Sequence, residues 1–545
     1  MAGKNNQKYA LISVFDKTGI ASLAKTIQNL GYKIISTGGT AKVIKENNIE
    51  VIPIEQITGN PESFDGRMKT ISFQIESGIL FDRSNSSHVK QAKELNIKPI
   101  DIVICNLYPF EQTIAKPGVT LNEAIENIDV GGPTMVRAAA KNFKNVLIVV
   151  DPKDYPMVAK YLVCHSEHFD YTQCKLREES QTKKRSFVKT QDDIRRMLAG
   201  KAFYHLSFYD SQVGKFFSNN RFPEEFTISA RKIKDLRYGE NPHQKASLYI
   251  TPHSFSAFQN INKLWGRELS LVNVIDINAG IESVRLFKKP TAVVIKHANP
   301  CGIALGKNPA EALKRAIKAD PESAFGGIIV LNKKMDLSTA RIIGDFKDER
   351  KSNIDIVAVP SIKKDALEYL KSIRKSMGIY AFDKLRKQNR KLENIKFING
   401  GFVSQTPDIG IEKSFREWKV VTKLKPTKKQ IELAKIGWAF ISRIKSNAVI
   451  ILDKNLPMTK GIGSGQTSRI RATKIALEQA GTYAKGATLV SDSFFPFDDS
   501  IRLAGEAGIG LIIQQGGSVS DQKTIGTADK LKIPMVFTGR RAFWH

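Results

Sequence analysis

The chain has 545 residues, of which 41% are hydrophobic and 25% charged, and its formal net charge is +30. This length exceeds what one hydrophobic core supports, and the composition is that of a soluble globular protein. No apolar run reaches the length of a membrane span, and the N-terminal ten residues lack the apolar core of a signal peptide. We therefore expect a cytoplasmic protein of several domains.

The charge and the cysteines restrict the kinds of partner. Lysines are spread along the chain without an RNP motif or zinc finger, so a surface that attracts small anions is favoured over nucleic-acid binding, which stays an alternative. The cysteines are Cys105, Cys164, Cys174 and Cys301, and none forms a metal-binding pair by spacing. We expect a reduced protein without structural disulfides or metal.

The first 150 residues alternate between strand and helix patterns. The predicted strands cover residues 10–15, 33–36, 49–53, 101–105 and 146–150. Residues 16–18 are expected to cap the first helix, whose apolar positions Ile20, Leu23 and Ile27 lie on one face. Such alternation predicts a parallel sheet covered by helices.

The middle of the chain divides the sequence. The charged stretch 177–189 reads as an exposed extension, a helix is expected over 192–217, and residues 219–223 form a linker. A second α/β region begins near residue 228. Within it, the polar, basic stretch 377–396 separates two parts, and late strands are expected over 448–452, 488–490 and 509–513.

Two segments near the start have the composition of anion sites. Thr37-Gly38-Gly39-Thr40 lies between a strand and a helix, where free backbone N–H groups attract a phosphate. Residues 65–70 add Arg67, Lys69 and a hydroxyl. A plain tight turn and a solvated loop are the alternatives.

Two further segments place polar groups beside a predicted strand and a helix. Asn106 and Tyr108 follow the strand that ends at Cys105, where ligands of parallel sheets bind. Asp129 precedes a helix that starts at Gly131-Gly132-Pro133, so its ionised form is favoured there, and Arg137 and Lys141 share one helix face. A capping aspartate with a solvated basic stripe explains the same spacing.

The stretch 291–302 is the most informative part of the second half. A β-branched run ends at Lys296 and His297 and then breaks at Asn299-Pro300 and Gly302. A histidine beside a fixed cation suits proton transfer. The alternatives are a solvated strand end and a Schiff-base role for Lys296.

Other turns of the second half suit a nucleotide and a flat ring. Arg237 can bind a phosphate and Tyr238 can stack, while the glycines of 320–327 allow close approach. The segment 461–469 runs from glycines into a helix without a Walker motif, and 491–499 combines aromatic rings with carboxylates. Surface turns and core packing remain the ordinary explanation of each.

These segments, in this order, resemble the bifunctional enzymes that join AICAR formyltransferase to IMP cyclohydrolase. The motifs are Ser13–Thr18, Leu236–Gln244, Lys296–Gly302, Ser491–Phe497 and Thr538–His545. The resemblance implies an α/β fold with an N-terminal methylglyoxal-synthase-like parallel-sheet domain over 1–225. A transformylase region of two cytidine-deaminase-like α/β subdomains would follow over 226–545, divided near 380–400.

The resemblance also implies the reactions. Formyl transfer from 10-formyltetrahydrofolate to the 5-amino group of AICAR would be followed by dehydrative closure of formyl-AICAR to IMP. Neither step would need a metal or a tightly held prosthetic group. A homodimer is implied, with small-molecule substrates and neither nucleic acid nor membrane as a partner.

The resemblance assigns roles to residues. His297 would be the base and Lys296 the cation of formyl transfer, while Lys69 and Tyr108 would stabilise the oxyanion and Asp129 and Lys141 transfer protons during ring closure. The first substrate site would use Ser13, Lys17, Thr37, Gly38, Gly39, Thr40, Arg67, Thr70, Cys105 and Asn106. The second would use Arg237, Tyr238, Gly326, Asp355, Asn447, Arg469, Phe494, Asp499, Ser518, Arg541 and Phe543.

Some positions depart from the usual family pattern. The sequence after Thr70 reads Ile71-Ser72-Phe73 and later Glu76, and Phe15, Ala542 and Trp544 also differ from common choices. An enzyme with transformylase activity alone, whose cyclohydrolase half is altered at Ser72 and Phe73, is the alternative function.

Overall fold

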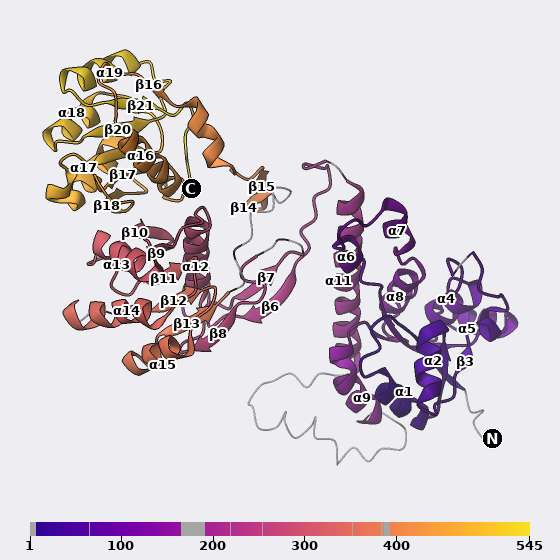
Figure 1. Cartoon of the computed structure of the whole chain (residues 1–545). Helices are drawn as coiled ribbons and strands as arrows, with labels where there is room; N and C mark the ends of the chain where they lie inside the picture. Colours follow the sequence, from indigo (N-terminus) through magenta and orange to yellow (C-terminus); the bar gives the residue numbers. More distant parts are fainter. Residues whose placement is uncertain are drawn as a thin grey trace. The chain divides into compact units, whose positions relative to one another are not determined.

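The computed structural model describes residues 7–64, 66–164, 191–218, 220–252, 254, 256–350, 353–382, 385 and 393–545. The chain divides into two compact units, Met1–Ser229 and Ala230–His545, which are considered separately (Figure 1). The expected extension over 177–189 and much of the stretch 377–396 lie outside the described residues.

The first unit is built on one parallel sheet. Its elements are β1 (Lys8–Val14), α1 (Ile20–Asn29), β2 (Tyr32–Ser36), α2 (Gly38–Glu46), β3 (Ile52–Pro53), α3 (Glu55–Thr58), α4 (Phe73–Leu80), α5 (Ser86–Glu94), β4 (Ile100–Asn106), α6 (Phe110–Ile114), α7 (Leu121–Glu126), α8 (Gly131–Lys141), β5 (Leu147–Val149), η1 (Pro152–Asp154), α9 (Tyr155–Cys164) and α11 (Gln191–Phe217). The strand order is β3-β2-β1-β4-β5, and every pair is parallel. The predicted parallel sheet is therefore present.

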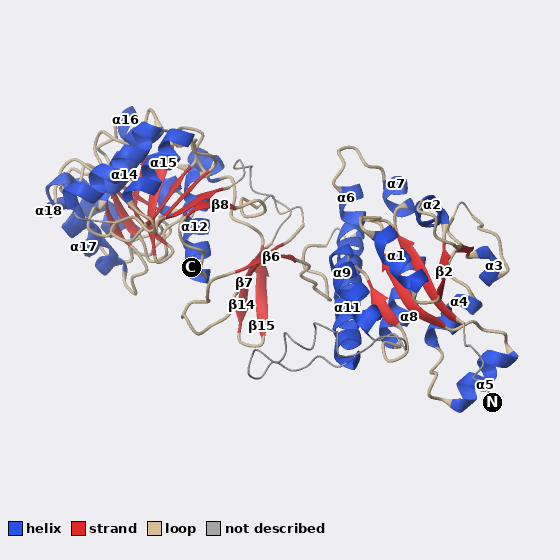
Figure 2. Cartoon of the chain, turned by 90° about the horizontal axis from the view of Figure 1, so that it is seen from below, coloured by secondary structure: helices blue, strands red, loops and turns tan. Residues whose placement is uncertain are grey.

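The order of the strands sets the helices on both faces. From β1 the chain moves outward through α1 to β2, and from β4 it moves the opposite way through α8 to β5. Right-handed crossovers in opposite directions place α1 and α8 on opposite faces, as Figure 2 shows. The buried aliphatic residues of the strands and helices form one core.

The start of α1 differs from the prediction. The residue before the helix is Gly19, in the left-handed region at φ 73°, and no side chain caps the helix. The Asp16 carboxylate instead accepts a hydrogen bond from the Thr18 N–H at 2.9 Å, which closes a turn ahead of the helix. The predicted strand over 49–53 is also shorter, at Ile52–Pro53.

The second unit contains two sheets of six strands. Its elements are β6 (Arg231–Asp235), β7 (Ser247–Ile250), β8 (Asn262–Trp265), α12 (Leu271–Val284), β9 (Thr291–Lys296), β10 (Asn299–Leu305), α13 (Pro309–Ala319), β11 (Ile328–Leu331), α14 (Leu337–Arg350), β12 (Ile356–Val359), α15 (Lys364–Ile373), β13 (Gly378–Ala381), β14 (Asn394–Ile398), β15 (Gly401–Gln405), η3 (Ile411–Glu417), β16 (Lys419–Val420), α16 (Lys428–Ile441), β17 (Val449–Leu452), β18 (Thr459–Gly463), α17 (Arg469–Ala480), η4 (Gly481–Ala484), β19 (Thr488–Ser491), α18 (Asp499–Glu506), β20 (Leu511–Gln514), α19 (Asp521–Lys530) and β21 (Met535–Phe537).

The two sheets repeat one topology. Their orders are β10-β9-β11-β12-β13-β8 and β18-β17-β19-β20-β21-β16, and the parallel and antiparallel pairs correspond along both. Each sheet opens with one antiparallel strand and a helix, followed by a hairpin and three further strands. The second unit thus consists of two α/β halves, as expected.

The hairpins of the two halves contact each other. The Asn299 Oδ1 atom at the start of β10 accepts a hydrogen bond from the Lys445 N–H at 3.2 Å, just before β17. At the other end of β10, the Leu305 N–H donates to the Pro457 carbonyl at 2.9 Å. One hydrophobic core includes residues from both sheets, so the halves pack as one body.

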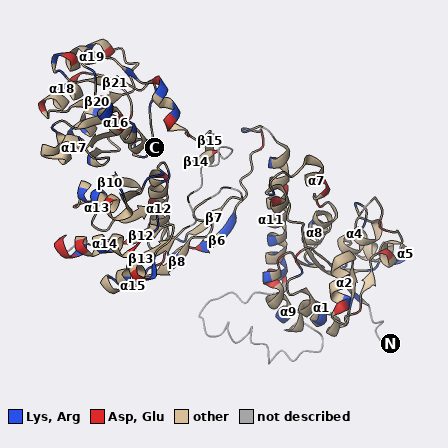
Figure 3. Ribbon diagram, viewed as in Figure 1, with Lys and Arg blue, Asp and Glu red and all other residues tan. Residues whose placement is uncertain are grey.

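Charged residues and cysteines occur in both units. Lys and Arg lie on elements of both units, interspersed with acidic residues (Figure 3). None of the described helices is long and apolar enough to cross a membrane. Cys105 and Cys301 are free, but Cys164 is disulfide-bonded, so the expectation that every cysteine is reduced is wrong for that residue.

Candidate active sites

The first site lies where the strand order of the first unit reverses. β2 and β4 flank β1, so the loops that follow β1 and β4 diverge and leave a crevice between them. Asn106, at the end of β4, spans this crevice. Its Oδ1 atom accepts from the N–H groups of Phe15 and Asp16 at 2.7 and 2.8 Å, and its Nδ2 donates to the Asp16 carbonyl at 3.1 Å. Asn106 therefore fixes the loop that contains Lys17.

Two cations meet at the N-terminus of α2. Thr37 precedes this helix without a side-chain cap, so the first N–H groups are available to an anion. The Lys69 Nζ atom lies 2.9 Å from the position that a Cβ on Gly38 would occupy, and Lys17 Nζ lies 3.9 Å from that of Gly39. A helix N-terminus with two ammonium groups attracts a phosphate.

The hydroxyl groups around this turn have different tasks. Thr40 Oγ1 donates to the Val14 carbonyl at 2.9 Å and accepts from the Val14 N–H at 3.1 Å, so it ties α2 to β1. Ser13 Oγ and Thr37 Oγ1 lie 3.5 Å apart at the crevice. Lys69 also pairs with Glu62 at 2.8 Å, which fixes the ammonium group over the turn.

Asp129 and Tyr108 lie close together at the start of α8. The Asp129 carboxylate accepts from the Gly132 N–H at 2.8 Å and from the Tyr108 N–H. Burial raises the pKa of Asp129, against these two hydrogen bonds, which lower it. The exposed Tyr108 ring packs against Phe15, with 5.2 Å between ring centroids. The arrangement suits a carboxyl group that exchanges a proton.

The loop that carries Arg67 and Thr70 reaches the same place. A Cβ on Gly131 would collide with Thr70 Oγ1, so this loop packs closely against the start of α8. Arg67 forms an ion pair with Glu126 of α7. The Cys105 thiol is buried and lies 3.9 Å from the Gly132 carbonyl, and burial raises its pKa, so it stays neutral. Thr70 and Cys105 thus lie beside the start of α8.

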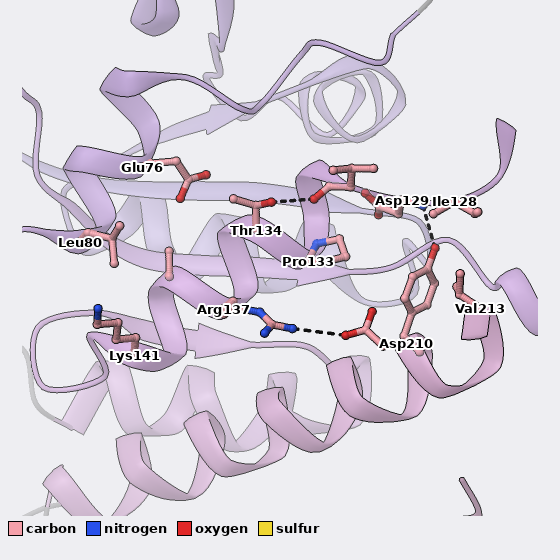
Figure 4. A pocket seen from close by; sticks show the side chains of 13 residues that line it. Glu76, Leu80, Ile128, Asp129, Pro133, Thr134, Arg137, Lys141, Asp210 and Val213 are labelled. Carbon is pink, nitrogen blue, oxygen red and sulfur yellow. Dashed lines mark hydrogen bonds and ion pairs between the residues drawn. The ribbon is translucent and has the colours of Figure 1, made fainter. Parts of the chain in front are cut away.

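The structure does not bring Asp129 and Lys141 together. The helix α8 separates them, and its ten steps from Gly131 to Lys141 span about 15 Å at the usual rise. Figure 4 shows the two side chains at opposite ends of a cavity of about 560 Å³. The cavity lies between α4, α8 and α11, and its lining includes Glu76, Arg137, Tyr209 and Asp210.

Glu76 is the unexpected group of this cavity. Burial raises its pKa to about 7. Its Oε1 atom is buried and has no hydrogen-bond partner among the described residues. Arg137 pairs with Asp210 at 3.3 Å instead, so the predicted basic stripe of α8 is divided between an ion pair and Lys141.

The second site is centred on the hairpin between β9 and β10. Lys296 and Asn299 form its last strand pair, and His297 and Ala298 make a two-residue turn with φ of 52° and 60°. Two positive φ values define the type I′ turn, which usually takes Asn-Gly. The Ala298 N–H donates to the Asp276 carboxylate of α12 at 2.6 Å. His297 is exposed on this turn.

Gly326 and Asp355 lie at the same edge of the first sheet. The Lys296 Nζ atom donates to the Phe325 carbonyl at 2.9 Å, which joins the hairpin to the loop before β11. Asp355 N–H donates to the Gly327 carbonyl at 3.0 Å. The Asp355 carboxylate accepts from Arg267 and Arg374, both at 2.9 Å, so it already has two cationic partners.

The start of the second sheet adds Asn447 and Arg469. Arg469 is buried, and it donates to Asn447 Oδ1 at 2.8 Å and pairs with Asp492. Asn447 Nδ2 donates to the Gln466 carbonyl at 2.8 Å. Because Lys445 holds Asn299, these residues lie beside the His297 turn. Arg469 organises this region through protein contacts.

The last residues of the chain join the same region. The Ser446 N–H donates to the Trp544 carbonyl at 2.8 Å, and the Ala542 N–H donates to the Asp492 carbonyl at 2.7 Å. The Arg541 guanidinium lies 4.7 Å from the centroid of the Phe543 ring. The predicted residues Arg541 and Phe543 are thus brought next to Asn447.

The other predicted residues of the second unit have weaker links to His297. Arg237 donates to the Tyr238 hydroxyl at 2.7 Å, and the backbone of both residues bonds near the start of α12. Phe494 and Asp499 follow β19, and Ser518 follows β20, where the Gln514 side chain accepts from the Phe495 N–H at 2.9 Å. Among the described residues, no hydrogen bond or ring contact joins Phe494, Asp499 or Ser518 to His297.

Comparisons with known proteins cover the whole chain. The family described as "AICARFT/IMPCHase bienzyme" matches residues 139–479, and the "MGS-like domain" family matches residues 19–134. Three relatives are called "Bifunctional purine biosynthesis protein PurH". They come from Thermoanaerobacter sp. (strain X514), Caldicellulosiruptor saccharolyticus and Halalkalibacterium halodurans, with 43%, 42% and 41% identity over 99% of this chain and 100% of each relative. A solved structure, "Crystal structure of ForH", is 30% identical over 39% of this chain and 100% of that chain, with a TM-score of 0.30, too low for a comparison of folds.

Proposed function

This chain belongs to the AICARFT/IMPCHase bienzyme family, and from that premise we propose which residues carry its two reactions. The protein is a bifunctional enzyme of purine biosynthesis, an AICAR formyltransferase with a folate-type formyl donor and an IMP cyclohydrolase. Its relatives match over their full length, so they give no support to a transformylase with an idle N-terminal half.

We propose that the second unit transfers the formyl group of 10-formyltetrahydrofolate. The 5-amino group of AICAR is a poor nucleophile because its lone pair is delocalised into the ring. His297 removes a proton from this amine as its nitrogen attacks the formyl carbon. The bond from that carbon to the folate nitrogen then breaks, and the leaving nitrogen takes up the proton, so that tetrahydrofolate departs neutral at that atom and His297 is regenerated. Lys296 stabilises the negative charge on the formyl oxygen. The observation that carries this proposal is the rigid turn that presents His297 beside Lys296.

The cyclohydrolase reaction is assigned to the crevice of the first unit. The carboxamide nitrogen attacks the formyl carbon, the ring closes, and water leaves. Lys69 and Tyr108 stabilise the oxyanion, and Asp129 exchanges the proton. The buried carboxylate beside Tyr108 supports this assignment. Lys141 remains the second proton-transfer residue, but its place at the far end of α8 means that substrate or water must connect it to Asp129.

The residues that contact the substrates are proposed from the same geometry. The phosphate of formyl-AICAR is assigned to the N-terminus of α2 with Lys17 and Lys69, which is supported by the two ammonium groups there. In the second unit, Asn447, Arg541 and Phe543 are the residues best supported as substrate contacts because they lie beside the His297 turn.

The cellular setting is proposed from the family resemblance. The enzyme acts as a homodimer in the cytoplasm, and its partners are the small molecules AICAR, formyl-AICAR and IMP. Sedimentation of the purified protein tests the dimer, since a monomer at assay concentration would contradict it.

His297→Ala tests the assignment of the base. We expect at least a hundredfold loss of formyl transfer, since general base catalysis contributes about 10²–10⁴-fold. Conversion of supplied formyl-AICAR to IMP should stay at the wild-type rate. His88→Ala, at an exposed histidine on α5, is the matched control and should retain both reactions. Equal formyl transfer by wild type and His297→Ala would overturn the role of His297.

A further inference from the structure

The turn that carries His297 has an unusual backbone for its residues. Both His297 and Ala298 lie in the left-handed region, which is unfavourable for residues with a Cβ. Their neighbours hold this conformation. Asn299 Nδ2 donates to the His297 carbonyl at 3.3 Å, and Asp276 accepts from the Ala298 N–H at 2.6 Å. The bond to Asp276 is the shorter of the two.

Asp276 belongs to a different element from the turn. It lies within α12, which is packed against β9, and its side chain is only 6% exposed. Burial raises the pKa of Asp276, whereas the Ala298 N–H and the nearby His297 imidazole lower it. The carboxylate therefore interacts electrostatically with the imidazole and bonds to the backbone of the turn.

Few other titratable groups face this turn. Lys296, on β9, points to the Phe325 carbonyl, and Asp320 acts with Lys296 and Asp276 on the Cys301 thiol. Burial raises the pKa of Cys301 to about 12, so this thiol does not ionise near neutral pH. Lys445 contacts the hairpin through its backbone N–H. Asp276 is thus the buried carboxylate that bonds to this turn.

We propose that Asp276 is a positioning residue for formyl transfer, which fixes the His297–Ala298 turn and stabilises the protonated imidazole. This inference rests on the proposed role of His297 as the base. When His297 accepts the proton of the amine, its charge forms beside Lys296, an unfavourable neighbour. The Asp276 carboxylate offsets that repulsion and holds the ring where the amine is bound.

Asp276→Asn separates the charge from the hydrogen bond. The asparagine Oδ1 atom can still accept from the Ala298 N–H, so the turn should persist, but the negative charge is lost. We expect kcat for formyl transfer to fall about 10-fold or more with KM for AICAR nearly unchanged. The acid limb of the kcat/KM profile should move to lower pH, because the carboxylate charge that favours the protonated base is then absent. Asp276→Ala removes both contributions and should cost more.

Three further measurements make the outcome decisive. Ser283→Ala, at a buried serine of α12 whose hydroxyl donates to the Ala279 carbonyl of the same helix, is the matched control and should leave the pH profile unchanged. Cyclohydrolase activity reports folding of the first unit, and circular dichroism reports folding of the whole chain. If Asp276→Ala fails to fold, Asp276→Asn alone decides.

His297→Ala, measured alongside, separates the two hypotheses. An active His297→Ala would contradict the proposed function itself. An inactive His297→Ala together with an Asp276→Asn of wild-type rate and wild-type acid limb would overturn the role of Asp276 and leave the base assignment standing.

Discussion

At the scale of single residues, burial in the first unit controls whether a carboxyl group is ionised. Glu76 lines the cavity along α8, and burial raises its pKa from the ordinary 4.5 to about 7. The folded state therefore binds a proton more tightly than the unfolded chain. Stability is lost as the pH rises from about 4.5 through about 7, because the buried carboxylate must then ionise.

The variant Glu76→Gln should remove this loss. At pH 5 the two proteins should have similar free energies of unfolding, and at pH 8 the variant should be more stable by at most about 3 kcal/mol. Urea denaturation at both pH values measures the difference. Glu50→Gln, at an exposed glutamate, should show no such pH-dependent gain. A stability gain of Glu76→Gln over wild type that is no larger at pH 8 than at pH 5 would contradict burial as the cause.

The candidate site residues differ in how well they can be predicted from the sequence. Asn106 and Asp129 were predictable because they stand at a strand end and a helix start, where ligands of parallel sheets bind. Asp276 was not, because a lone aspartate inside a helix has no local signal, and only the fold brings it to a turn 22 residues later. Asp492 follows β19 in the segment 491–499, whose carboxylates were noted in the sequence, but its pairing with Arg469 could not be predicted because only the fold brings the two together.

At the scale of elements, close packing of strands on helices fixes several glycines. A Cβ on Gly302 of β10 would collide with the Ala316 carbonyl of α13, and one on Gly461 of β18 would collide with the Ala476 carbonyl of α17. The same contact thus occurs in both halves of the second unit. Neither glycine has a positive φ, so the requirement is space rather than backbone conformation.

Gly302→Ala should therefore destabilise the second unit by about 1–3 kcal/mol, the usual cost of overpacking. Denaturant unfolding, followed by the fluorescence of tryptophans in the second unit, measures the loss. Gly401→Ala in β15 is the matched control, because nothing lies within 4 Å of the added methyl group and φ is not positive. Equal stability of Gly302→Ala and Gly401→Ala would show that α13 moves away without cost.

Elements were predicted where their local pattern was strong. The apolar β-branched runs gave the strands β4, β9, β17 and β20 nearly at their observed bounds. The start of α1 was misplaced because Gly19 replaces a side-chain cap. The two-residue turn at His297 could not be read from composition, since it contains neither Asn-Gly nor Asp-Gly.

At the scale of the whole molecule, the charge of +30 is the dominant property. Both substrates of formyl transfer are anions, so a positive field raises their local concentration near the enzyme. Salt screens such a field over about 10 Å at 0.1 M.

We therefore expect kcat/KM for AICAR to fall several-fold between low salt and about 0.3 M NaCl, with a smaller change in kcat. Steady-state kinetics in NaCl test this, and sucrose of equal osmolarity serves as the uncharged control. A kcat/KM that does not respond to salt would mean that the excess of lysine has no part in substrate capture.

The repeated strand order of the second unit has a consequence for its history. A chain that builds the same six-stranded topology twice has the form left by tandem duplication of an ancestral half. The two copies have since diverged at their hairpin tips, with His297 and Ala298 in one and the longer loop 453–458 in the other. In the proposed function, the reactive groups lie at one tip, while the sister copy supplies Asn447 as a proposed substrate contact. Selection should accordingly tolerate replacements in 453–458 that it would reject at 296–299.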